Sequence, residues 1–543
     1  MKKIETLGKE VVMAWSKRFL IIAAVFFFSI PAFCQVYEAW VQTYNGPADD
    51  DDEPRNMTVD DSGNIYVAGW SMGVNTYYDF ATIKYTPDGD TAWIRRYNWK
   101  SNLEEIPKDI EVDQAGNVYV TGYSRDSLTG MDMLTIKYDP AGETLWARRY
   151  NGPANGGENV SRMEIGPDGS IYITGSSEGS GSYADFCTVK YTPDGDLVWV
   201  RALNGPANWA DGGEELAFDQ DGNAYVSGIT EGIGSGRDVT TIKYSPEGEL
   251  LWYDTYNNPS NDHDFVGSLN LDGYGNVYVS GTSKYYSWGI RVYILKYSGD
   301  GDILKLTTYN GLIEGDGSVG LNRLDSDGNL VAIGHIGRSY AGGYLTSKFN
   351  GKGEILWTRI YDNPVPGGDY FDGATSMVLD DYNNIYVTGY SAGFGVRHDF
   401  ATAMYSPAGK MIWLARFNIP PDYSEEAYTM ALDQQGNIYV SGITEISTET
   451  LTVIENFVTV KYSPCPDWVG DLSDDHSLGI ADIVYLVNVI FKSWQIPKGA
   501  CLADVDNSGM TTLSDVMYLV DHIFHDGYPP VLNGKCCPSM QHL

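Results

Sequence analysis

The sequence has few histidines and cysteines for its 543 residues, seven and six respectively. The histidines are scattered, and no H-E-x-x-H, G-x-S-x-G or P-loop pattern occurs. Basic residues are also scarce, since 36 Lys and Arg stand against 72 Asp and Glu, for a formal net charge of −36. This acidity argues against nucleic acid and anionic membranes as partners, because both require a basic surface. It suits cations, above all calcium, and basic or neutral partners, but it also serves simply to keep an exported protein soluble.

Long apolar runs are missing as well. The longest, Phe19 to Phe28, is too short for a membrane span of about 20 residues. Lys17 and Arg18 precede it, and small residues follow it up to Gln35, which is the pattern of a secretory signal peptide. We therefore expect residues 1–34 to be a signal peptide and the protein to be secreted or displayed at the cell surface, rather than integral to the membrane.

Cleavage before Gln35 leaves five cysteines, which are unevenly distributed. Cys187 lies in a strand-like segment and is expected to be a small buried apolar side chain. The other four lie near the C-terminus: Cys465, Cys501, Cys536 and Cys537. Disulfides among these four would link the C-terminal region in an oxidising compartment, and their connectivity stays open.

Glycine and tyrosine, in contrast, are abundant, with 61 Gly and 40 Tyr, and they recur in a phrase of the type G-N-x-Y-V-x-G. Most successive copies are 53 residues apart, and a long fixed period is typical of repeat proteins. The copies begin at Gly63, Gly116, Gly169, Gly222, Gly275, Gly328, Asn383 and Gly436. We therefore interpret the chain as one unit used eight times.

A single unit contains four short runs with alternating apolar residues, separated by Gly, Pro and Asp turns. In the unit that begins at Glu158, one such turn is Pro193-Asp194-Gly195. Four antiparallel strands per unit of this length are typical of a β-propeller blade. An aspartate three residues before most phrases is expected to accept backbone N–H bonds across the turn: Asp60, Asp113, Asp219, Asp272, Asp325, Asp380 and Asp433.

Most units close with a run that contains a tryptophan, although Lys305 replaces it in the fifth unit. A further closing run, Trp40 to Asn45, precedes the first phrase, and the eighth unit lacks its own closing strand. We predict that the N-terminal strand completes the last blade and closes a ring of eight, which would protect the edges of the sheets.

The phrase D-x-x-G-N-x-Y-V-x-G, a T-x-K-Y strand and the closing Trp make the repeats similar to the secreted bacterial SBBP family, a seven-bladed β-propeller repeat. The resemblance covers residues 37–463. It implies an all-β propeller over residues 35–464. The family's blade number differs from our count, so seven and eight blades remain alternatives at this stage.

Two classes of loop are expected on one face of the propeller. Loops from an outer strand to the next inner strand are acidic: Asp49 to Asp52, Glu53, Glu104, Glu105, Asp211, Glu214, Glu215, Asp262, Asp264, Glu314, Asp316, Asp369, Asp372, Glu425 and Glu426. They are either a site for a cation or basic partner, or ordinary solvated charges. Loops between the second and third strands, such as 71–78 and 445–455, are variable and rich in Tyr, Ser and Gly, which suits carbohydrate or protein recognition as well as ordinary loops.

After Gly470 the pattern becomes helical. Apolar residues at helical spacing run from Ile483 to Phe491, and the same set returns 33 residues later, from Val516 to Phe524. A possible calcium loop precedes each stripe, and oxygen ligands at positions 1, 3, 5 and 12 follow the EF-hand pattern. The second loop has Asp504, Asp506, Ser508, Met510, Thr512 and Asp515. The first has Asp471, Ser473, Asp475, Ser477 and Asp482, with His476 in the usual glycine position.

Two such loop-helix units resemble a type I dockerin. The resemblance implies a calcium-binding module over residues 465–530, followed by a tail over 531–543, and a cohesin-like or cell-surface protein as its partner. We therefore expect an exported, non-enzymatic binding or scaffold protein. The alternatives are a carbohydrate-active enzyme with paired carboxylates such as Glu214 and Asp264, a polysaccharide-binding component of an extracellular complex, and a purely architectural surface protein.

Overall fold

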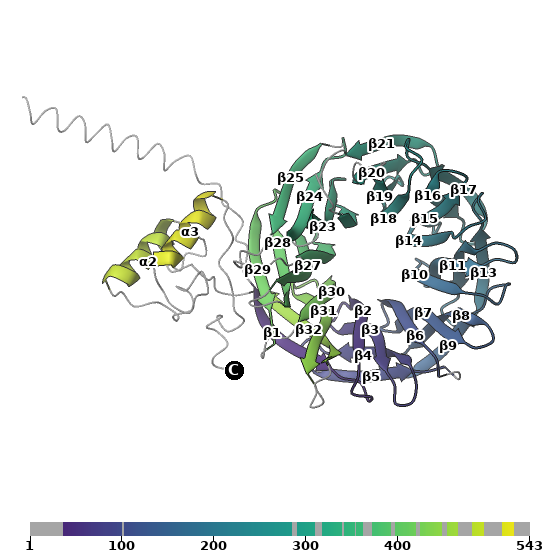
Figure 1. Ribbon diagram of the computed structural model, residues 1–543, viewed down its shortest axis with the longest axis horizontal. Helices are drawn as coiled ribbons and strands as arrows, with labels where there is room; N and C mark the ends of the chain where they lie inside the picture. Colours follow the sequence, from purple (N-terminus) through teal and green to yellow (C-terminus); the bar gives the residue numbers. More distant parts are fainter. Residues whose placement is uncertain are drawn as a thin grey trace, which may run out of the picture.

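The computed structural model describes residues 36–99, 102–284, 290–309, 318–338, 341–352, 354–361, 372–392, 397–419, 424–447, 453–464, 480–492 and 513–525. Within these ranges the chain forms eight four-stranded antiparallel sheets and two helices. The sheets are arranged as the blades of a propeller around a central axis (Figure 1). The prediction of eight blades is therefore confirmed.

The first four blades use strands β2 to β17 in chain order. Blade 1 consists of β2 (Asp52–Val59), β3 (Ile65–Met72), β4 (Tyr78–Tyr85) and β5 (Thr91–Tyr97). Blade 2 consists of β6 (Glu105–Val112), β7 (Val118–Asp126), β8 (Gly130–Tyr138) and β9 (Thr144–Tyr150). Blade 3 consists of β10 (Glu158–Ile165), β11 (Ile171–Glu178), β12 (Ala184–Tyr191) and β13 (Leu197–Leu203). Blade 4 consists of β14 (Gly212–Phe218), β15 (Ala224–Gly232), β16 (Gly236–Tyr244) and β17 (Leu250–Tyr256).

The last four blades follow the same order, except at the end. Blade 5 consists of β18 (Asp264–Leu271), β19 (Val277–Lys284), β20 (Ile290–Tyr297) and β21 (Ile303–Tyr309). Blade 6 consists of β22 (Ser318–Leu324), β23 (Leu330–Arg338), β24 (Ala341–Phe349) and β25 (Ile355–Tyr361). Blade 7 consists of β26 (Gly373–Leu379), β27 (Ile385–Ala392), β28 (His398–Tyr405) and β29 (Met411–Phe417). Blade 8 consists of β30 (Glu425–Leu432), β31 (Ile438–Ser447), β32 (Val453–Pro464) and the N-terminal strand β1 (Val36–Tyr44).

The N-terminal strand closes the ring, as the count of closing runs predicted. It pairs antiparallel with β32 from Val36 opposite Pro464 to Tyr44 opposite Phe457. Each innermost strand also contacts the innermost strands of the two neighbouring blades, including β30 against β2. Sequence-distant ends of the propeller thus share one sheet, and no blade is left with three strands (Figure 1).

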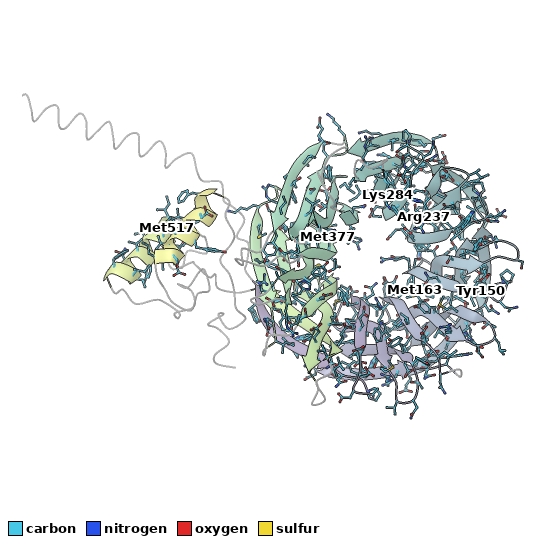
Figure 2. All side chains as sticks on the ribbon, in the orientation of Figure 1. Tyr150, Met163, Arg237, Lys284, Met377 and Met517 are labelled. Atoms are coloured by element: carbon cyan, nitrogen blue, oxygen red, sulfur yellow. The ribbon has the colours of Figure 1, made fainter. Side chains whose placement is uncertain are left out.

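The hydrophobic core lies between the blades. Each of the eight interfaces between neighbouring blades has its own cluster of buried apolar residues. Met163 and Met377, on the innermost strands β10 and β26, are completely buried, and Figure 2 places both towards the inside of the ring. Cys187 on β12 is also completely buried, which confirms it as an apolar core residue. The alternating pattern of the sequence therefore buries both faces of each blade against its neighbours.

The aspartates before the repeated phrase have the structural role predicted for them. Asp433 is representative: its carboxylate accepts hydrogen bonds from the backbone N–H of Gln435 and Asn437 at 2.9 and 2.8 Å and from the Tyr439 hydroxyl at 2.9 Å. Equivalent bonds form at Asp60, Asp113, Asp219, Asp272 and Asp380. One side chain thus satisfies several donors of the turn between the first two strands.

The closing tryptophans join each blade to the next. The indole of Trp93 donates to the Pro140 carbonyl at 3.1 Å and covers Gly142, where an added Cβ would lie within 2.8 Å of the ring. Equivalent indole bonds form from Trp40, Trp146, Trp199, Trp252 and Trp357. Lys305, which replaces tryptophan in blade 5, donates its ammonium to the Gly351 carbonyl of blade 6. The lysine therefore preserves the bond between blades without the aromatic ring.

Two helices follow the propeller in the chain, α2 (Ile480–Lys492) and α3 (Leu513–His525). They contact each other, with Leu486 and Leu519 completely buried. These helices coincide with the apolar stripes predicted from the sequence. No helix among the described residues is long and apolar enough to cross a membrane.

Candidate binding site

The two predicted classes of loop do share one face of the propeller. The loop that enters blade 2 meets the loop between β7 and β8, where the backbone N–H of Arg125 donates to the Glu104 carbonyl at 2.8 Å. The same contact recurs in blade 5, from Lys284 to His263 at 2.7 Å. We call this surface the loop face. Functional side chains from neighbouring blades can therefore meet there.

The acidic series divides into two groups in the structure. One carboxylate at the start of the innermost strand is at most 3% exposed in seven blades: Asp52, Glu105, Glu158, Asp211, Asp264, Asp372 and Glu425. Glu158 was not part of the predicted series. The corresponding position of blade 6 falls on Gly317, outside the described residues. These side chains are inside the protein and are not available to a ligand on the loop face.

Carboxylates of this ring hold entering loops in place, since Asp52 and Asp211 accept the backbone N–H of Gly46 and Gly205. Asp264, for example, accepts a hydrogen bond from the backbone N–H of Asn258 at 2.9 Å and another from the Ser283 hydroxyl. Burial, only partly offset by such bonds, raises the pKa of Glu105 to about 8, of Glu158 to about 7 and of Asp52 to about 6. These carboxyls are therefore structural groups that favour the protonated form.

This ring of carboxyls predicts an unusual pH dependence of stability. A carboxyl with a raised pKa in the folded state stabilises the fold below its unfolded pKa of about 4, and this contribution is lost as the pH rises through the folded value. We expect the free energy of unfolding, measured with denaturant, to fall between about pH 4 and pH 8. In the Glu105→Gln variant, the free energy of unfolding should fall less over this pH range. Glu104→Gln, which changes the neighbouring carboxylate beside Arg125, should follow the wild type; an unchanged slope in Glu105→Gln would contradict the assignment.

Other members of the acidic series gather on the loop face at blades 8 and 1. Burial, followed by the charges of Asp51, Glu53 and Glu426, raises the pKa of Glu455 to about 7. Glu426 also lies 3.0 Å from Nδ1 of His398. Glu314, Asp316 and Asp369 lie outside the described residues. Within the described part of the chain, no group of three or more His, Cys, Asp and Glu side chains could hold a metal ion.

The paired carboxylates expected of a glycosidase occupy different environments. Asp264 belongs to the buried ring described above. Glu214 lies on the innermost strand of blade 4, where burial and the neighbouring Glu215 raise its pKa to about 7. Nearby inner strands carry an ionic network in which Arg162 lies 3.7 Å from Asp109 and 2.9 Å from Glu164. Asp264 thus binds its own entering loop, whereas Glu214 lies on an inner strand.

The most exposed aromatic pair lies on the loop face between blades 3 and 4. Tyr183 follows β11, and Trp209 belongs to the loop that enters blade 4. Their rings stack with centroids 5.3 Å apart and planes inclined by 8°. Tyr183 is 60% exposed and Trp209 is 58% exposed, so the pair is not part of the core.

A pocket of about 460 Å³ adjoins the tryptophan of this pair. Trp209 and Ile233, which is 81% exposed, provide its apolar walls, and Glu231 provides a carboxylate. The remaining lining consists of Pro206, Ala207, Gly232, Gly234 and Gly236. Its volume is in the range of small-molecule sites. We call this site the aromatic pocket.

The sequence reasoning missed the aromatic pocket, although a signal was present. The loop entering blade 3 reads NGPANG from Asn151 to Gly156, and that entering blade 4 reads NGPANW from Asn204 to Trp209. Asn155 and Asn208 share a positive φ, of 51° and 54°, so the two loops have the same turn. Trp209 is therefore an exposed aromatic substitution in a repeated loop that forms equally well with glycine.

A second cavity, of about 540 Å³, lies at the opposite ends of the strands between blades 4 and 5. Asp219, Asp272 and Lys243 contribute to its lining. It arises because the proline that packs against the turn glycine in earlier blades, such as Pro246 against Gly222, is replaced by Gly299. The ion pair between Lys243 and Asp219, at 3.3 Å, partly neutralises this cavity.

Only the last ligand position of each predicted calcium loop lies within the described residues. Asp482 and Asp515 occupy the first turns of α2 and α3, and both are completely buried. The other predicted ligands lie outside the described residues: Asp471, Ser473, Asp475, Ser477, Asp504, Asp506, Ser508, Met510 and Thr512. The structure thus places the residues predicted for the twelfth loop position inside the protein, at the start of each helix.

Comparisons with protein families agree with the repeat architecture. Residues 40–75 match the SBBP family, described as a beta-propeller repeat. Residues 62–91 and 166–197 match a beta-propeller domain of unknown function, DUF5122. The chain thus contains SBBP beta-propeller repeats, arranged here in eight blades. No curated protein matches the chain.

Several solved structures align with the chain at low identity. The beta-propeller domain of the Trilobed protease from Pyrococcus furiosus is 11% identical, with 70% of this chain and 99% of that chain covered and a TM-score of 0.39. Drosophila Plexin A in complex with Semaphorin 1b is 10% identical, with 65% and 84% covered and a TM-score of 0.38. An alpha-L-arabinofuranosidase from Fusarium graminearum is 14% identical, with 56% and 93% covered and a TM-score of 0.33.

Proposed function

We propose that the protein is an exported, non-enzymatic binding protein. In this proposal the loop face of the propeller recognises a ligand, and a calcium-dependent dockerin-like module attaches the protein to a cohesin-like or cell-surface partner. The observation that carries the proposal is the exposed stack of Trp209 on Tyr183 beside the aromatic pocket. Large exposed aromatic side chains cost solubility and add nothing to the core, and they are typical of recognition surfaces.

The helices support the docking part of the proposal. α2 exposes Ile480, Val484 and Phe491, and α3 exposes the equivalent residues 33 positions later, Leu513, Met517 and Phe524. Each of these six side chains is more than half exposed. Exposed apolar faces on helices suit a protein partner that buries them.

A pull-down tests the proposed function. The mature chain is immobilised and incubated with proteins secreted by its source and with a glycan array, in calcium and in EGTA. We expect a secreted protein to bind the wild-type chain in calcium and not in EGTA. The double variant Val484→Asp, Met517→Asp should no longer bind this protein. The matched double variant Val74→Asp, Leu128→Asp, which places the same charges at exposed propeller loops, should retain it. Binding that is the same in calcium and in EGTA, and the same for the helix variants, would contradict the docking proposal.

A further inference from the structure

We infer that the aromatic pocket at the loops of blade 4 binds a neutral saccharide, whose ring lies against Trp209 and Ile233. This inference rests on the proposed function as a binding protein and names the ligand class of its propeller. The loops that build the pocket, its shape and its charge support this assignment.

The loops of blade 3 provide an internal reference for the loops that build the pocket. Glu178 to Asp185 (EGSGSYAD) in blade 3 corresponds to Glu231 to Asp238 (EGIGSGRD) in blade 4. Ser180 thus corresponds to the exposed Ile233, as Gly156 corresponds to Trp209. In blade 3 the space beside Gly156 is taken by the Glu178 carboxylate, which accepts the Gly157 N–H at 3.0 Å. Both loops therefore fold when these two positions hold small residues. The fold of blade 4 does not require the apolar side chains of Trp209 and Ile233.

The shape of the pocket favours a small, flat ligand with polar edges. Tyr183 supports one face of the Trp209 ring, which fixes the indole at little entropic cost. The pyranose ring presents a face of C–H groups that packs on an indole, while its hydroxyls point outwards. At the rim, the Glu231 carboxylate and the backbone of Gly232 to Gly236 can bond these hydroxyls. A volume of about 460 Å³ is large enough for a short saccharide segment.

The charge around the pocket selects against acidic sugars. Glu231 is the charged residue among those that line the pocket. Arg237 is the nearest cation in sequence, and its Nε lies 4.0 Å from the Glu231 carboxylate. A uronate or sialate would thus approach the Glu231 carboxylate in a pocket whose lining contains no basic side chain. We therefore assign neutral saccharides, rather than acidic ones, to this site.

Isothermal titration of the mature chain tests this inference with three neutral probes, cellohexaose, xylohexaose and mannohexaose, and one acidic probe, hexagalacturonate. We expect at least one neutral probe to bind and hexagalacturonate to bind at least tenfold more weakly. Trp209→Gly, which restores the blade 3 residue, should weaken binding of the neutral probe at least tenfold, because aromatic stacking is lost. Ile233→Ser should weaken it by a smaller factor, and both variants should melt within a few degrees of the wild type.

The control is Tyr274→Ala, which removes a 93% exposed aromatic side chain beside the cavity at the opposite ends of the strands. It should bind the neutral probe like the wild type. If none of the three neutral probes binds, or if Trp209→Gly binds as tightly as the wild type, the saccharide assignment is overturned. The docking proposal would still hold if a secreted protein binds to the helices in calcium. Failure of the saccharide assignment can therefore be distinguished from failure of the proposed docking function.

Discussion

Deletion of β1 (Val36–Tyr44) is expected to destabilise the whole propeller, although it removes only nine residues. Without β1, the outer edge of β32 loses its antiparallel partner along its length, from Phe457 to Pro464. An unpaired edge of this length exposes backbone groups to other chains and favours aggregation. We expect the truncated chain to be largely insoluble, or to elute as oligomers in size-exclusion chromatography, whereas the mature chain elutes as a single species.

A point variant separates the strand pairing from the packing of its tryptophan. The Trp40 indole donates to the Pro87 carbonyl of blade 1 at 3.1 Å, and its ring lies 5.9 Å from Tyr85 and 6.0 Å from Tyr439. Trp40→Ala should cost about 3 kcal/mol in the free energy of unfolding, as for large aromatic truncations. Thr43→Ala, at an exposed position of the same strand, should change it by less than about 0.5 kcal/mol. Equal effects of the two variants would contradict ring closure through this strand.

A synthetic peptide of residues 36–48 provides the complementary test. If the deletion acts only through the missing strand, the peptide should bind the edge of β32 and raise the melting temperature of the truncated chain in a concentration-dependent way. A peptide in which Trp40 is replaced by alanine should be less effective. Full stability of the truncated chain without any peptide would show that blade 8 closes by another route.

Removal of calcium is expected to unfold the two C-terminal helices while the propeller remains folded. If the predicted loops bind calcium, a free concentration 1,000 times the Kd adds about 4 kcal/mol of stability to the helix pair by mass action. The propeller is all-β, so the helical circular dichroism of the mature chain reports mainly on α2 and α3. We expect EGTA to abolish this signal and excess calcium to restore it, with little change in the melting of the propeller.

Variants in α3 test whether the calcium effect depends on the predicted ligands. Asp515 is completely buried in the first turn, whereas Asp521 is exposed two turns later. Asp515→Asn should raise the calcium concentration needed for half-maximal helical signal at least tenfold, because it removes a charged ligand at the twelfth position. Asp521→Asn should leave that concentration unchanged. A helical signal that is the same in calcium and EGTA would show that the module is not a calcium-binding one.

The repeat architecture was predictable because its causes are local. The Asp-Gly turns, the alternating strands and the aspartates before each phrase act within one blade, and each recurs at a fixed spacing. The same local logic predicted the helices, whose apolar stripes coincide with α2 and α3. The count of closing runs also predicted that Trp40 and its strand belong to the last blade, because every other blade already had four strands.

Which of the acidic loop residues are buried could not be predicted in the same way. Asp52 and Glu53 are adjacent acidic residues, yet Asp52 is completely buried beneath its loop while Glu53 contributes to the charges around Glu455. Side chains alternate direction along a strand, so neighbours in sequence enter different surroundings. The exact strand start therefore decides which carboxylate is structural, and a sequence pattern places that start only to within a few residues.

The repeat unit, its four strands and the closure by the N-terminal strand could be predicted from the sequence alone, because turn chemistry and side-chain alternation depend on near neighbours. The stack of Tyr183 on Trp209 could not, because these residues are 26 positions apart and come from different loops. Their contact depends on how blade 4 packs against blade 3, which is set by the buried residues of the interface between them. The repeated residues thus build the scaffold, whereas the candidate binding site is formed by loop residues that are not repeated.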